Sequence, residues 1–409
     1  MRRTILTAVA ALLIQVPPVI AQQKSLTLSE VVNLGRQHNL RLQARARDVA
    51  SLESTWRASR LLFNPSVGLE TGRGESYDGT VERTVRGISL SQQMENPFTR
   101  RARIHMAENE WRAAEAARRN LALDITYDIT EHFLRILLLE ERVELARRSL
   151  ESFEQAHQLI SRRLELGEAT ELEALKLEVE VMRARTELSQ IEVEERLVRQ
   201  HLDTLVGNSL PEDFEPAPME PFRPLTVPEE VLLEQALNSH PRVERAEYEI
   251  ARARDHLRAT RSSPIPGPEL TGFLHDELDG RIQGIGIAFA LPLWNMAGRE
   301  TAAARTLAEG REYDLEALKL ELISEISIRY SWLALTADTI ELFEEGLLRQ
   351  AEESLRIAET SYRAGEISLL AYLDARRTYF QILNDYQDAL YAWYVNRAAL
   401  ERAVGEEIR

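Results

Sequence analysis

The chain has 409 residues, no cysteine and a formal net charge of −16 at pH 7. The lack of cysteine excludes disulfides, thiolate metal sites and a lipid anchor on an N-terminal cysteine. The acidic balance argues against nucleic acid as a partner, since phosphate binding needs a basic surface. The eight histidines share no metal-ligand spacing, and the sequence holds no nucleophile elbow, phosphate loop or HExxH motif. We therefore expect no enzyme, no cofactor and no resident metal.

The N-terminal residues predict export. Arg2 and Arg3 precede an apolar run from Ile5 to Ile20, which ends just before Gln22. We assign residues 1–21 to a cleaved secretory signal peptide. Two prolines in the run disfavour the alternative, a single transmembrane anchor. No other apolar run approaches the roughly 18 residues that a membrane-spanning helix needs, so any membrane crossing would have to use strands.

The first half of the chain predicts a helix, two strands and a long helical hairpin. Residues 65–72 and 84–94 alternate in character, which indicates strands with unlike faces joined by a polar turn. From residue 98 to residue 210 there is no proline, and the composition favours helix. The predicted elements are a helix over 28–62, the two strands, a helix over 101–166, a turn at Gly167 and a helix over 170–206.

The predicted helices are unusually long. A helix of about 65 residues spans about 100 Å, far more than a helix of an ordinary globular domain. The return helix carries Leu172, Leu175, Val179 and Met182, which step alternately by three and four residues, the heptad rhythm. We therefore expect an antiparallel coiled coil, with an ordinary antiparallel bundle as the alternative.

The second half of the chain repeats the first. The Gly-Glu dipeptide at residues 167–168 recurs 198 residues later at 365–366, and the register holds across roughly 180 residues. We predict a first structural repeat over 22–207, a proline-rich linker over 208–228 and a second repeat over 229–409. The second repeat should contain a helix over 228–261, strands over 269–275 and 281–291, a helix over 299–364, a turn at Gly365 and a helix ending at Val404.

One strand segment shows the alternation most clearly. Its large apolar side chains, which alternate with glycine and alanine, are Ile285, Ile287, Phe289 and Leu291. Strands of about ten residues are long enough to cross a membrane when tilted, so we expect this row to face lipid. Four strands cannot close a barrel, and lipid does not tolerate open strand edges, so several chains must contribute. A small soluble β-layer is the alternative.

In this order of elements, the whole mature chain resembles the TolC-like family of trimeric outer-membrane efflux ducts. Residues 291–299 look like the strand-to-helix transition of that family, and residues 362–365 look like its second hairpin turn. The short chain with compact loops is most similar to the heavy-metal (cobalt-zinc-cadmium type) branch. The resemblance implies a mainly α fold with membrane β: long coiled-coil hairpins plus four strands per chain in a homotrimeric 12-stranded β-barrel.

The same resemblance implies a function. The chain would be the passive exit duct of a tripartite efflux system, exporting small solutes or metal ions from a pump in the inner membrane. It would lie in the outer membrane, in contact with its lipid, and its helices would extend into the periplasm to meet an adaptor protein. The alternatives are a type I protein-secretion duct and a periplasmic coiled-coil scaffold or adhesion protein without a pore.

Candidate site residues gather at the two hairpin turns. The resemblance makes Asp374, Glu173 and Tyr362 candidates for a pore constriction, although Ala371 and Lys176 stand at two positions where an acid would strengthen it. A solvated acid in the first turn of a helix is the alternative role for either carboxylate. The turn formers and exposed leucines expected to dock an adaptor are Gly167, Gly365, Leu166, Leu172, Leu369 and Leu370.

Overall fold

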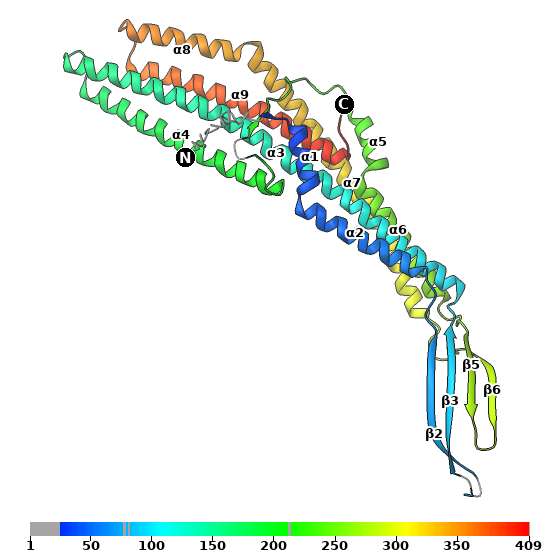
Figure 1. Ribbon diagram of the computed structural model, residues 1–409. Helices are drawn as coiled ribbons and strands as arrows, with labels where there is room; N and C mark the ends of the chain where they lie inside the picture. Colours follow the sequence, from blue (N-terminus) through cyan, green and yellow to red (C-terminus); the bar gives the residue numbers. More distant parts are fainter. Residues whose placement is uncertain (1–24, 77–78, 81, 212–213, 409) are drawn as a thin grey trace, which may run out of the picture.

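The protein is elongated, with helical hairpins at one end and a β-sheet at the other (Figure 1). The computed structural model describes residues 25–76, 79–80, 82–211 and 214–408. The predicted signal peptide, residues 1–21, lies outside this part of the chain. Within it, no helix combines the length and the apolar character that a membrane span requires.

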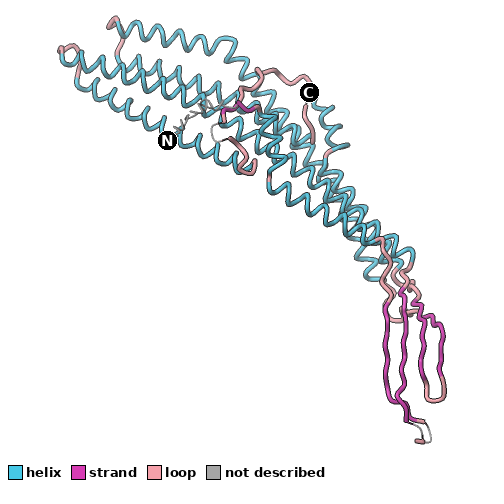
Figure 2. The backbone as a smooth tube through the Cα atoms, viewed as in Figure 1, coloured by secondary structure: helices cyan, strands magenta, loops and turns pink. Residues whose placement is uncertain are grey.

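The sheet has four antiparallel strands in the order β2-β3-β5-β6, and each repeat contributes one hairpin (Figure 2). The strands are β2 (Ser66–Glu75), β3 (Glu82–Gln93), β5 (Glu269–Asp276) and β6 (Arg281–Ala288). The prediction that the last strand reaches residue 291 is wrong. Ala288 pairs with Glu269, and the preceding Pro268 has no N–H with which to continue the ladder. Two further short strands, β1 (Ser25–Leu26) and β4 (Glu215–Pro216), were not predicted.

The first helical hairpin agrees with its prediction, whereas the second differs. In the second hairpin, the outgoing helix is interrupted by a π-helical turn. Within this turn, Gly346 has backbone dihedral angles outside the helical range. Glycine has low helix propensity, and such a turn bends a helix. The Tyr386 hydroxyl holds this turn by a 2.8 Å hydrogen bond to Glu344. The helices are α3 (Pro97–Glu165), α4 (Glu171–Leu205), α7 (Gly298–Leu342), the π-helix η1 (Phe343–Leu347), α8 (Leu348–Arg363) and α9 (Leu369–Val404).

The two predicted helices that precede the strands are each split in two. The breaks fall at equivalent residues, Asn39 and His240, which end one helix and cap the next. Polar side chains that bind the backbone favour caps over helix interiors, so Asn39 and His240 are the local signal for the two breaks. The resulting helices are α1 (Leu28–His38), α2 (Leu40–Ser59), α5 (Glu229–Ser239) and α6 (Pro241–Ser262).

Each of the two capping residues also ties its cap to a distant helix end. The Asn39 side chain accepts from the backbone N–H of Arg41 and donates to the Leu205 carbonyl at 2.8 Å. His240 takes the same place in the second repeat. Its Nδ1 accepts from the Arg242 N–H at 3.0 Å, and its Nε2 lies 3.2 Å from the Arg402 carbonyl. These two contacts require a neutral imidazole with its proton on Nε2.

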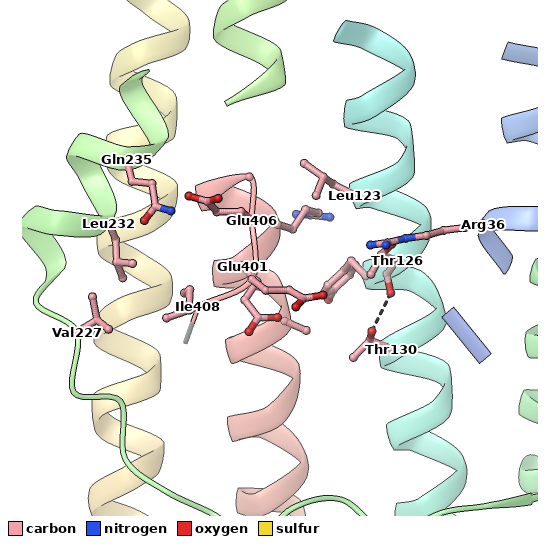
Figure 3. Close-up of a pocket in the computed structure, with 15 residues that line it drawn as sticks. Arg36, Leu123, Thr126, Thr130, Val227, Leu232, Gln235, Glu401, Glu406 and Ile408 are labelled. Atoms are coloured by element: carbon pink, nitrogen blue, oxygen red, sulfur yellow. Dashed lines mark hydrogen bonds between the residues drawn. The ribbon is translucent and has the colours of Figure 1, made fainter. Parts of the chain in front are cut away.

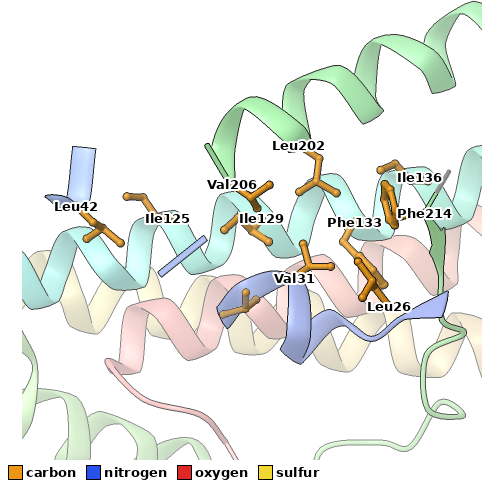
Figure 4. Packing of buried hydrophobic residues seen from close by; sticks show 11 residues of the cluster. Leu26, Val31, Leu42, Ile125, Ile129, Phe133, Ile136, Leu202, Val206 and Phe214 are labelled. Carbon is orange, nitrogen blue, oxygen red and sulfur yellow. The ribbon is translucent and has the colours of Figure 1, made fainter. Parts of the chain in front are cut away.

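Each repeat has its own buried core where its helices meet. In the first repeat, Leu202 and Val206 come from the end of the return helix, and Ile129 and Phe133 come from α3 (Figure 4). In the second repeat the equivalent core surrounds Trp393. The long helices α3 and α7 both pack against α6, so the two repeats form one body.

We predict that the helical body loses stability as the pH falls through about 6.5. Burial lowers the pKa of His240, so the folded protein favours the neutral ring. Stability from such a group is present above its unfolded pKa of about 6.5 and is lost as the pH falls below it. Thermal unfolding measured from about pH 8 to about pH 5 should show this decrease.

The matched control is His240→Asn, which copies the cap of the first repeat. This variant should keep its melting temperature over the range in which the wild type loses stability. An equal decrease in both proteins would contradict a role for His240.

Candidate functional site

The two hairpin turns lie at the end of the molecule opposite the sheet (Figure 1). Gly167 and Gly365 both have φ = +78°, a left-handed conformation that favours glycine. In each turn the glycine N–H and the next N–H bond back to the last turn of the helix, as in a Schellman motif. The predicted turn positions are confirmed in both repeats.

The helices that follow the two turns begin differently. Thr170 and Glu173 form a capping box: the Thr170 N–H donates to the Glu173 carboxylate at 2.9 Å, and the Glu173 N–H donates to the Thr170 hydroxyl. Hydrogen bonds from the Thr170 backbone and hydroxyl lower the pKa of Glu173. In the second repeat Ser368 caps alone, because Ala371 stands where the box needs an acid. Glu173 thus stabilises the N-terminus of α4 as part of its capping box.

The other two constriction candidates have contrasting surroundings. Asp374 is exposed on α9, and its carboxylate forms no ion pair with any residue that the structure describes. Tyr362 is buried, and its ring stacks on Tyr372 with centroids 5.2 Å apart. Burial raises the pKa of Tyr362, and the nearby Glu173 carboxylate raises it further. Of the three candidates, only Asp374 presents a charge to solvent without a partner among the described residues.

The expectation that all four leucines at the tip are exposed is wrong for Leu369. This side chain is only 3% exposed and belongs to a core that fills the space between the two hairpins. Leu370, the next residue, is 67% exposed. Leu166 and Leu172 are also exposed in the single chain. Leu369 is buried because it lies on the face of α9 that turns toward Ile160 and Leu177 of the first hairpin.

Arg376, which lies on the same face of α9, was not among the predicted site residues. It is 1% exposed, donates to the Ser149 carbonyl at 2.8 Å and lies over the Phe153 ring at 3.9 Å. Burial lowers the pKa of its guanidinium. A signal existed, because Leu369, Tyr372 and Arg376 follow the i, i+3, i+7 spacing of one helix face.

The sheet has two unlike faces. Ile285 is 91% exposed, and strand pairing places it on the same face as Ile287, Val67 and Leu69. We call this face the outward face. Phe289 and Leu291 are exposed as well but lie beyond the end of β6. The opposite, inner face consists largely of small or polar residues, including Gly68, Gly72, Gly87, Ser89, Gly284 and Gly286.

A cavity of about 620 Å³ opens where the two repeats meet (Figure 3). Its wall includes Arg402 of α9, whose guanidinium lies 4.6 Å from the Tyr127 ring of α3 and 3.2 Å from a Glu325 carboxylate oxygen. The ring contact thus joins the two repeats beside the cavity, whereas the ion pair joins α9 to α7 within the second repeat. Across the described residues, no three His, Asp or Glu side chains are arranged to hold a metal.

Comparison with known proteins gives one family. The profile described as "Outer membrane efflux protein" matches residues 31–208 and again residues 232–406. The cobalt-zinc-cadmium resistance protein CzcC of Cupriavidus metallidurans is 27% identical over 387 residues, which cover 93% of this chain and 90% of that protein. The pyoverdine export outer membrane protein OpmQ of Pseudomonas aeruginosa is 24% identical over 364 residues, covering 87% and 75%.

Solved structures share the fold. A crystal structure of CusC has a TM-score of 0.81 at 16% identity and covers 93% of this chain and 92% of that one. The outer-membrane channel OprN has a TM-score of 0.81 at 17% identity, covering 92% and 89%.

We predict that truncation of the two adjacent leucines of α9 has effects of very different size. Leu369→Ala should destabilise the tip by about 2–5 kcal/mol, because it removes buried side-chain atoms and leaves a cavity. Leu370→Ala should change stability by less than about 0.5 kcal/mol. Hydrogen exchange of the amides on either side of Gly167 and Gly365 measures both effects. Equal protection in the two variants would contradict the core position of Leu369.

Proposed function

The chain belongs to the outer membrane efflux protein family, and on this premise we propose that it is the exit duct for divalent metal ions. It is the outer-membrane component of a tripartite efflux system and works as a homotrimer with a periplasmic adaptor and an inner-membrane pump. Its helical body lies in the periplasm. The cargo and the roles of individual residues are our proposals.

The observation that carries the proposal is the sheet with one apolar face and two unpaired edges. Strands β2 and β6 each have a neighbour on one side only among the described strands. In lipid these edges must be paired, and the antiparallel order allows β2 of one copy to lie beside β6 of the next. Three copies then close twelve strands, with the outward face toward lipid and the inner face around water.

The net negative charge of the chain and its sequence similarity to CzcC support metal ions as the cargo. The chain carries 66 acidic and 50 basic residues, and an acidic channel concentrates cations. Of the relatives above, CzcC is named for resistance to cobalt, zinc and cadmium, and its alignment spans nine-tenths of both proteins. A duct need not ligate its cargo, so the proposal requires no resident metal site.

The duct itself does no chemistry in this proposal. It lowers the barrier to export by enclosing a water-filled path through lipid, while the pump supplies the energy. Residues 1–21 direct export of the chain, and the linker over 208–228 joins the two repeats. At the tip, the exposed side chains of Leu166, Leu172 and Leu370 offer apolar contacts to the adaptor.

A transport experiment tests the cargo. The chain is expressed with a metal pump and its adaptor in cells that lack their own duct, and tolerance of zinc, cobalt and cadmium is measured. We expect tolerance to rise with the wild type. It should not rise with Leu370→Asp, which assembles but loses an apolar docking residue. Restored export of an organic solute or a polypeptide without any gain in metal tolerance would contradict metal as the cargo.

We also predict that Asp374→Asn lowers the cation selectivity of the channel. Three copies of this carboxylate at a narrow tip attract cations and repel one another. Planar bilayer recordings compare the variant with Asp385→Asn, which removes the same charge from the same helix about three turns further on. Selectivity and conductance both unchanged in Asp374→Asn would exclude this residue from the constriction.

A further inference from the structure

The strand turns lie at the end of the sheet farthest from the helices (Figure 1). Toward these turns the outward face changes from apolar to charged residues. Near the helices it is mainly apolar, and Gln92 and Gln283 are its polar members. On β2, the next residue of the outward face after Leu69 is Thr71, which pairs with Arg86 of β3. One step further, Arg73 pairs with Thr84. Residues opposite one another on antiparallel strands share a face, so both arginines lie directly beyond the apolar row.

The second hairpin adds a third arginine at the same level. Arg281 of β6 pairs with Asp276 of β5 and forms an ion pair with it at 2.9 Å. Arg73 lies 3.8 Å from a Glu82 oxygen, in a pair whose members are both largely exposed. Arg86 forms no ion pair with any residue in the described ranges. The residue pairs at the two levels beyond the apolar row therefore hold three arginines and one aspartate on this face, and the next pair adds Glu75 and Glu82.

We propose that Arg73, Arg86 and Arg281 bind the phosphate groups of an anionic glycolipid in the outer leaflet. Two residues along a strand span about 7 Å, so a lipid whose acyl chain lies on the apolar row brings its headgroup to the arginines. The guanidinium fork matches phosphate oxygens in a bidentate way. The hydroxyls of Thr71 and Thr84 flank the same place and can donate to the same phosphate.

The adjoining apolar row points to a lipid rather than a dissolved anion. Arg73 is 86% exposed, and in water such a charge is screened and binds free anions weakly. A lipid adds the burial of its acyl chain to the same contact. The inference depends on the outer-membrane location but not on the cargo, so it and the metal proposal can fail separately.

The experiment uses the purified full-chain trimer in detergent, and native mass spectrometry reports the bound lipid. The probes are diphosphorylated lipid A, its dephosphorylated form and inorganic phosphate. We expect the trimer to retain lipid A in preference to the dephosphorylated form. The double variant Arg73→Gln with Arg86→Gln should bind lipid A roughly tenfold or more weakly. Arg83→Gln is the matched control, because Arg83 pairs with Gly74 on the inner face of the same strands.

Three results would overturn the proposal. The first is equal retention of lipid A and its dephosphorylated form by the wild type, a comparison that decides the matter even if the double variant does not assemble. The second is an equal loss of lipid in Arg83→Gln. The third is displacement of lipid A by inorganic phosphate at a similar concentration, which would indicate a site for a dissolved anion.

Discussion

The unpaired backbone edges of a four-stranded sheet are the constraint on which the rest of this molecule depends. Each unsatisfied N–H or C=O group costs several kcal/mol in hydrocarbon, and β2 and β6 each leave one edge open among the described strands. Four strands are too few to close into a barrel within one copy. The chain becomes a membrane protein only by joining other copies, and the channel is a consequence of that closure.

Duplication explains why one chain supplies two strand hairpins and two helical hairpins. At the tip, however, the two repeats differ in structure. The glycine turns are the same in both repeats. The helix after the first turn starts with a capping box, and the helix after the second has Ala371 in place of the acid. The second hairpin alone is bent by η1. The two hairpins at the tip are therefore not interchangeable, and in our proposal Asp374 of the second one faces the cargo.

Local signals were readable from the sequence, and contacts between distant segments were not. Gly167 and Gly365 could be assigned because a Schellman turn depends on its own few residues, and the strands could be assigned because alternation is local. The burial of Leu369 depends on which side of α9 meets the first hairpin. Arg376 is buried among apolar residues against the usual preference of arginine. The split at His240 needed the cap to be recognised inside an otherwise helical pattern.

The chain contains no cysteine, so introduced cysteines can form disulfides only where they are placed. Double variants with one cysteine on each open edge, such as Leu69→Cys with Ile285→Cys and Val67→Cys with Ile287→Cys, probe the contact between copies in native outer membranes. The account predicts a covalently closed trimer in at least one register after oxidation. Monomer alone in every register, together with a mature polypeptide that stays folded and monomeric without detergent, would contradict it.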